Sequence, residues 1–265
     1  MKRFYKIGLT LFAIMGLNCL TIPSTLAQSS FLVVPTTAKL SPVGSGVTKT
    51  FLIENVSKEI LAVEIYCTKR EIDIDGNESQ SLVEDDFLLY PPQIILKPGE
   101  SQSVRLTWVG DPQPPQELAY WMITAQVPIP VKTEEKPETI EQQPSQGIRV
   151  NISALFNHQG AIYITPRNIK SSLVLESVSH RKNDEGKDQL VILFENKGTA
   201  HQLLRDVEIK LTSNNNQNQS IILTKQQLNS VEGKNILAGN KRQFIIPWPQ
   251  ELPVGEVTAT VEINR

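Results

Sequence analysis

Hydrophobic and polar residues alternate with a period of two along most of the chain, which is the spacing of a strand with one buried face. The alternating runs are short, rich in Val, Ile and Thr, and separated by turn sequences such as Asp75-Gly76-Asn77. No long segment has the period of an amphipathic helix, so the pattern predicts an all-β protein. Strands are expected at residues 51–53, 61–69, 103–109, 119–127, 148–156, 161–164, 173–178, 189–196, 207–212, 242–247 and 254–263.

Short strands at regular spacing are typical of β-sandwiches. One group of runs precedes Pro166 and a second follows Ser171. We therefore expect two sandwich domains, residues 28–166 and 167–265, with a hinge at 166–168. Residues 132–147 interrupt the rhythm with four glutamates, two prolines and no apolar face, which predicts a long mobile loop.

The N-terminal residues have the pattern of a secretory signal peptide. Three basic residues precede an uncharged, mostly apolar run at 7–20, and Thr25-Leu26-Ala27 supplies small residues at the two positions that a signal peptidase reads. The run is short for a membrane span, which needs about 20 apolar residues. We expect cleavage after Ala27 and a soluble, exported mature chain.

Charge and cysteine content narrow the possible functions. Lys and Arg number 26 against 28 Asp and Glu, and no basic tract is present, which argues against a nucleic-acid partner. Of the two cysteines, Cys19 lies in the signal peptide, so the mature chain cannot form an internal disulfide. We expect Cys67 to be a buried small hydrophobe, with a reactive or intermolecular thiol as the alternative.

The sequence contains no motif that indicates an enzyme. It contains no nucleophile elbow, phosphate loop or dinucleotide fingerprint, and its histidines, His158, His180 and His201, lack the spacing of metal ligands. We predict no catalytic residue, metal, cofactor or small-molecule substrate. The three tryptophans lie in strand-like runs and are expected in the core: Trp108, Trp121 and Trp248.

The run 148–156 alternates strictly up to its last two residues and places five apolar side chains on one face: Ile148, Val150, Ile152, Ala154 and Phe156. An ordinary half-buried strand explains this pattern. From periodicity alone this is the preferred explanation, and the alternative is an edge strand that offers an apolar row to another protein. Such rows are normally suppressed because they cause aggregation, and where they occur on purpose they act by strand addition.

Several segments occur in an order that is typical of one family. They read FLVVPTTAKLSPVGSGVTKTFLIENVS, YPPQIILKPGESQSVRLTW, ELAYWMITAQVPIP, IRVNISALFNHQGAIYITP, LVILFENKGTAHQLLRDVEI and ILAGNKRQFIIPWP. Together they resemble the PapD-like periplasmic chaperones of pilus (fimbrial) assembly, most closely the divergent, archaic-type branch. The resemblance implies two immunoglobulin-like β-sandwich domains in tandem, set at an angle. It also implies pilus subunits and an outer-membrane usher as partners.

In this family a donor strand fills the groove of a subunit whose own sandwich lacks its last strand. Counted back from Pro166, the donor positions are Ile152, Ala154 and Phe156, with Val150 extending the row. The resemblance thus favours the second explanation of the run 148–156, and it implies binding, stabilisation and delivery of subunits by donor-strand complementation.

One departure from the family concerns the anchor for the carboxylate at the subunit's terminus. Family members use an Arg and a Lys in the cleft between the domains, and the aligned positions here are Thr37 and Ala161. Candidate substitutes are Thr36, Thr37, Lys39 and Arg167.

The alternative functions are an exported structural or adhesive surface protein, which would not need two complete domains, and a carbohydrate-binding module, which the 6% aromatic content disfavours.

Overall fold

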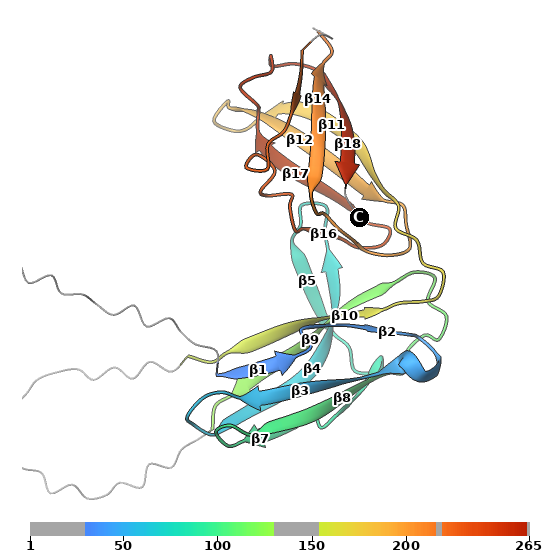
Figure 1. Cartoon of the computed structure of the whole chain (residues 1–265), viewed down its shortest axis with the longest axis vertical. Helices are drawn as coiled ribbons and strands as arrows, with labels where there is room; N and C mark the ends of the chain where they lie inside the picture. Colours follow the sequence, from blue (N-terminus) through green and yellow to red (C-terminus); the bar gives the residue numbers. More distant parts are fainter. Residues whose placement is uncertain (1–29, 130–153, 216–218, 264–265) are drawn as a thin grey trace, which may run out of the picture.

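The computed structural model describes residues 30–129, 154–215 and 219–263, and almost all regular structure in them is β-strand. Figure 1 shows two strand-built bodies, one formed by the first half of the chain and one by the second. The expected signal peptide, the expected loop 132–147, and the donor residues Val150 and Ile152 lie outside the described residues.

The first domain packs two sheets face to face. One sheet has the order β1 (Phe31–Val34), β3 (Thr48–Asn55), β8 (Ser101–Trp108) and β6 (Phe87–Tyr90). A 3₁₀ turn, η1 (Gly44–Val47), leads into β3. The other sheet has the order β2 (Thr37–Leu40), β10 (Asn157–Ile164), β9 (Leu118–Val127), β4 (Leu61–Ile72) and β5 (Glu78–Leu82), with β7 (Gln93–Leu96) also paired to β4. Alternate apolar residues of both sheets form a continuous core, among them Phe51, Ile53, Leu106, Met122 and Ile162.

The second domain repeats this architecture. One sheet contains β11 (Leu173–Lys182), β12 (Asp188–Asn196) and β17 (Lys241–Pro247), and the other contains β15 (Ser220–Ile222), β14 (Val207–Ser213) and β18 (Val257–Ile263). A short pair, β13 (Gln202–Leu203) and β16 (Asn235–Ile236), completes it. Its core is separate from the first and includes Leu190, Ile192, Phe194, Ile209 and Leu211. The fold is thus two immunoglobulin-like sandwiches, as predicted, while the domain boundary at Pro166 stays a prediction.

The period of two located most strands but not all of them. All five residues of β5 are exposed, so this strand has no alternation to detect. The expectation of a strand through residue 156 was wrong at its end, because residues 154–156 have no strand structure and β10 begins at Asn157. Cys67 is buried, as expected, and burial raises the pKa of its thiol to about 12.

Trp108 and Trp248 are buried, whereas Trp121 is only partly covered and carries the guanidinium of Arg70 at 4.2 Å from its ring. The expectation that all three tryptophans are core residues was therefore wrong for Trp121. Its strand, β9, faces the core with the neighbouring residues Tyr120 and Met122, so Trp121 lies on the other side of the sheet.

The two domains touch through a hairpin and a small apolar cluster. In Figure 1 the hairpin of β4 and β5 rises from the first domain towards the second. At its tip, the backbone N–H of Gln243 donates to the carbonyl of Ile74 (2.7 Å), and the amide of Asn240 donates to the carbonyl of Ile72 (3.0 Å). The apolar cluster joins Leu237 of the second domain to three buried residues of the first: Ile72, Ala119 and Tyr163.

Candidate functional site

The described part of the expected donor segment ends on the surface of the first domain. Ala154 is exposed, and Phe156 is half-buried and packs against the first core. The Phe156 carbonyl accepts from the backbone N–H of Gln126 (3.0 Å), and its N–H donates to the Gln126 side-chain oxygen (3.3 Å). Phe156 is thus tied to β9 in this structure, while Ala154 is free to contact another chain.

The two positions at which the family carries its basic pair lie side by side. β10 and β2 run parallel, and Ala161 is paired with Thr37 in their register. The N–H of Ala161 donates to the carbonyl of Thr36 (3.0 Å). Thr37 and Ala161 both line a cavity of about 500 Å³ between the domains. The other candidates, Thr36, Lys39 and Arg167, are exposed and do not line it.

The cavity is lined by more positive than negative side chains. Four permanent cations line it, Arg70, Arg205, Lys234 and Arg242, and Glu78 is the one carboxylate among the described lining residues. Arg70 already engages that carboxylate, with Nη2 at 2.6 Å from Oε1 and Nε at 3.2 Å from Oε2. The remaining three cations give the cavity an excess of positive charge, which favours an anionic ligand.

Arg70 is held rigidly at the first-domain wall. Besides Glu78, its guanidinium lies over the Trp121 ring, and Nη1 donates to the Tyr163 hydroxyl (3.2 Å). Trp121 Nε1 donates to the same Glu78 carboxylate (3.2 Å). Because Nε, Nη1 and Nη2 each already donate a hydrogen bond, Arg70 shapes the cavity more than it offers a free binding group.

The three remaining cations all belong to the second domain. Arg205 and Lys234 are exposed, and neither has an ion-pair partner among the residues that the structure describes. Arg242 packs its guanidinium against the turn at Gly76, and its Nε is buried without a hydrogen-bond partner. Burial lowers the pKa of Arg242, while the nearby Glu78 and Asp73 oppose this effect. Arg242 thus adds positive charge to the cavity wall.

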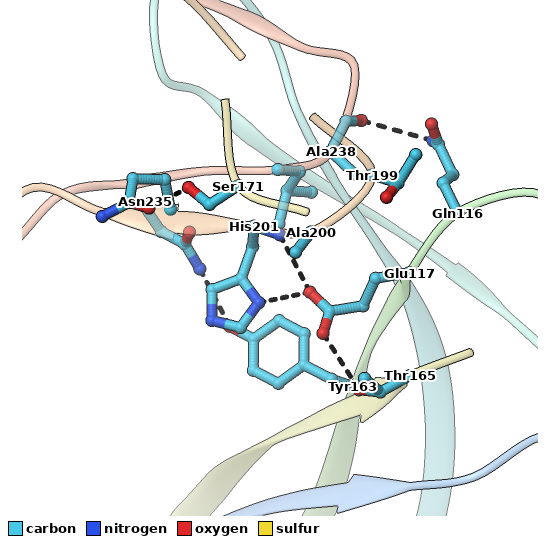
Figure 2. A network of polar contacts seen from close by, with 12 residues as sticks. Gln116, Glu117, Tyr163, Thr165, Ser171, Thr199, Ala200, His201, Asn235 and Ala238 are labelled. Atoms are coloured by element: carbon cyan, nitrogen blue, oxygen red, sulfur yellow. Dashed lines mark hydrogen bonds and ion pairs between the residues drawn. The ribbon is translucent and has the colours of Figure 1, made fainter. Parts of the chain in front are cut away.

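A polar network centred on Glu117 joins the domains beside the cavity (Figure 2). Glu117 Oε1 accepts from the backbone N–H of His201 (3.0 Å) and contacts His201 Nδ1. Glu117 Oε2 accepts from the Thr165 hydroxyl (2.9 Å). Burial by itself raises the pKa of Glu117, but the hydrogen bonds and charge of His201, with the bond from Thr165, outweigh it and lower that pKa.

Tyr163 continues the network into the cavity. Its ring stacks on the His201 imidazole with centroids 4.0 Å apart, and its hydroxyl accepts from the Asn235 amide (2.8 Å). His201 and Glu117 are 84 residues apart in sequence, so no spacing rule links them. Four cavity residues were missed from the sequence, because three lie in irregular connections and one in a strand, with no local motif to mark them: His201, Arg205, Lys234 and Arg242.

A family model covers most of the first domain. Residues 33–153 match the family described as pili and flagellar-assembly chaperone, PapD N-terminal domain. The chain is PapD-like, and its first domain belongs to this chaperone family. The matched range includes Val150 and Ile152 and stops before Ala154, so it reaches into the expected donor segment.

Solved structures of fimbrial chaperones share the fold of this PapD-like chain. A structure titled as the CsuC–CsuE chaperone–tip adhesion subunit complex, from archaic Csu pili of Acinetobacter baumannii, is 15% identical with a TM-score of 0.53, covering 86% of this chain and 91% of that one. A chain from a chaperone–tip adhesin complex of CFA/I fimbriae is 17% identical with a TM-score of 0.52, covering 89% and 99%. The class 5 fimbriae chaperone CfaA is 17% identical with a TM-score of 0.50, covering 89% and 100%.

At identities of 15–17%, these structural matches show agreement in fold alone. No curated protein matches the PapD-like chain. Within the described ranges, no helix is long and apolar enough to cross a membrane, and no group of three or more His, Cys, Asp or Glu residues is placed to hold a metal ion.

Proposed function

We propose that this protein is a periplasmic chaperone that binds and stabilises pilus subunits by donor-strand complementation and delivers them to an outer-membrane usher. The observation that carries the proposal is the family match over residues 33–153, in a chain that folds as two immunoglobulin-like sandwiches. Two similar structures are complexes of a chaperone with a tip adhesin or tip adhesion subunit, which supports the choice of partner. The proposed route to the periplasm is export through the signal peptide, residues 1–27.

The proposed donor row is Val150, Ile152 and Ala154, with Phe156 at its end. In a groove left open by a missing strand, Val150 and Ile152 would each contribute about 1.5–3 kcal/mol on full burial, less the cost of ordering and association. Ala154 is exposed and small, so a large subunit residue fits opposite it. Phe156 packs on the chaperone's own core, and we assign it the role of fixing where the donor row ends.

The interdomain cavity is the proposed anchor for the subunit's terminal carboxylate. Thr37 and Ala161 are neutral, so the charge must come from elsewhere, and Arg205, Lys234 and Arg242 are the cavity cations without a carboxylate partner. The Thr37 hydroxyl supplies a neutral donor at the first-domain wall. This assignment replaces Thr36, Lys39 and Arg167 as candidates, since none of these lines the cavity.

The test is subunit capture in the periplasm. The full precursor is co-expressed with each exported β-rich subunit encoded beside its gene, and the soluble subunit that co-purifies is quantified. Ile152→Asp places a carboxylate in an apolar groove and should abolish capture with an unchanged melting temperature. Leu155→Asp is the matched control, because Leu155 is exposed and has the opposite parity in the alternating run.

The carboxylate anchor is tested in the same assay. Arg205→Gln combined with Lys234→Gln should lower capture roughly tenfold, since charge-assisted hydrogen bonds are lost. Normal capture by the Ile152→Asp variant would refute the donor strand. Normal capture by the double variant would refute the anchor and leave the donor strand standing.

A further inference from the structure

His201 stands where the cavity meets the interdomain network. It follows the linker and first strands of the second domain, yet its closest partners, Glu117 and Tyr163, belong to the first. Its side chain is 18% exposed and lines the cavity, while the Glu117 side chain is 2% exposed. Among the residues that the structure describes, the imidazole is thus the one side chain that both contacts the buried carboxylate and lines the cavity.

The contacts of Glu117 determine which nitrogen of the ring faces the carboxylate. Nδ1 points at Glu117 Oε1, the same oxygen that accepts the backbone N–H of His201 (Figure 2). A carboxylate accepts and cannot donate, so Nδ1 carries a hydrogen in the neutral ring. Nε2 has no hydrogen-bond partner among the described residues and is not one of the buried unpaired atoms. Nε2 is therefore the position at which the ring gains its second proton.

Charged groups on several elements face this ring. Glu117, before β9, favours its protonation, and the Arg70–Glu78 pair on β4 and β5 is close to neutral. Around the same cavity the second domain contributes three cations that oppose protonation: Arg205, Lys234 and Arg242. An anion bound among those cations would offset their repulsion and leave the attraction of Glu117 dominant.

We propose that His201 is the proton-controlled cation of the interdomain cavity, and that gain of a proton at Nε2 strengthens anion binding there. The identity of the anion as a subunit carboxylate rests on the proposed function, but the control by His201 does not. Histidine changes charge between about pH 5 and pH 8. By linkage, a bound anion must in turn favour protonation of the ring by the same factor.

Sulfate is the probe, because its charge does not change over this range and any pH dependence must come from the protein. Binding of sulfate to the full mature protein is followed by amide and histidine NMR shifts at about pH 5.5 and about pH 8. One added charge in a partly screened cavity should tighten binding roughly three- to tenfold at the lower pH. In the wild-type protein, sulfate should also move the midpoint of the His201 titration to higher pH.

Two variants and a control separate His201 from other groups. His201→Gln should bind sulfate with little pH dependence, at the weaker affinity. His201→Lys should bind with little pH dependence at the stronger affinity, which guards against a merely structural effect. His180→Gln is the matched control, because His180 also pairs with a carboxylate, Asp188 (2.6 Å), but lies outside the cavity. It should keep the full pH dependence.

The outcomes distinguish the two proposals. Sulfate binding at the cavity with equal affinity at both pH values would overturn the role of His201 and leave the anion site intact. A pH dependence of sulfate affinity that survives in His201→Gln would also overturn the role of His201. Absence of any sulfate-induced shift at Arg205, Lys234 and Arg242 would overturn the anion site, and the control by His201 with it.

Discussion

Asn55 and Asn196 hold the same place in the two domains, each as the buried last residue of a strand. The Asn196 amide donates to the carbonyls of Ala200 (2.8 Å) and Ile236 (3.0 Å), and its oxygen accepts the N–H of Gly198 (3.0 Å). Asn55 likewise donates to the carbonyls of two residues, one close in sequence and one across the domain: Glu59 and Leu96. Each asparagine joins its own turn to a distant segment.

Asn196→Ala should therefore lower the free energy of unfolding by about 2–4 kcal/mol, since it removes hydrogen bonds of a buried amide to the carbonyls of Ala200 and Ile236 and from the N–H of Gly198. Urea denaturation measures the change. Asn183→Ala is the control, because Asn183 accepts only from N–H groups of an exposed turn, those of Glu185 and Lys187. It should cost about 0.5–1 kcal/mol. Equal losses in the two variants would contradict a structural role specific to Asn196.

At the scale of elements, the turn of the β4–β5 hairpin packs closely against the second domain. Gly76 has φ +89°, and a Cβ there would lie 2.1 Å from Arg242 Nη2. Gly186 has φ +75° and open space around it. Alanine at either position should cost about 1 kcal/mol of stability through the backbone. Only Gly76→Ala should also displace Arg242, seen as changed NMR shifts along β17. Matching spectra for the two variants would argue against the contact.

The end of the expected donor segment makes a second prediction at this scale. Phe156 is half-buried against the first core, whereas Leu155 is 49% exposed. Phe156→Ala should lower the free energy of unfolding by about 1–3 kcal/mol, and Leu155→Ala by less than about 0.5 kcal/mol. Thermal or urea unfolding of the free protein measures both. No loss in Phe156→Ala would show that this side chain is free for a partner.

At the scale of the whole molecule, Glu117 links domain contact to pH. The pKa of Glu117 is lowered in the folded protein, so its contribution to stability is present above its unfolded pKa, near 4.5, and is lost as the pH falls through the folded value. Wild-type stability should fall across this acidic range, and Glu117→Gln should be less stable at neutral pH with a shallower fall. Melting curves from neutral to acidic pH measure both.

The control for this prediction is Glu71→Gln. Glu71 pairs with Lys69 on the surface, with both side chains at least half exposed, so removing its charge should change little. A Glu117→Gln profile that parallels the wild-type profile would rule out the interdomain carboxylate as the source of the acid sensitivity.

Strand periodicity, turn residues and the order of the segments were enough to predict an all-β chain, two immunoglobulin-like sandwiches and a buried Cys67. The all-β class, the two sandwiches and the burial of Cys67 depend on local spacing or on a residue's own hydrophobicity, whereas the immunoglobulin-like character of the sandwiches was implied by the family resemblance. Periodicity failed for β5, whose five residues are all exposed, and for residues 154–156, which have no strand structure. In both cases neighbouring segments, and not the local pattern, decided the structure.

The amino-acid sequence by itself determined the class of fold and where most of its strands lie, because burial of alternate side chains is a local requirement. It also determined that Thr37 and Ala161 carry no charge. Only the tertiary structure decided where positive charge collects. Arg70 and Arg242 are separated by most of the chain, and His201 is 84 residues from Glu117, yet all of them lie at the contact between the domains. Charge and hydrogen bonding act through space, so such a site exists only once the two sandwiches are packed together.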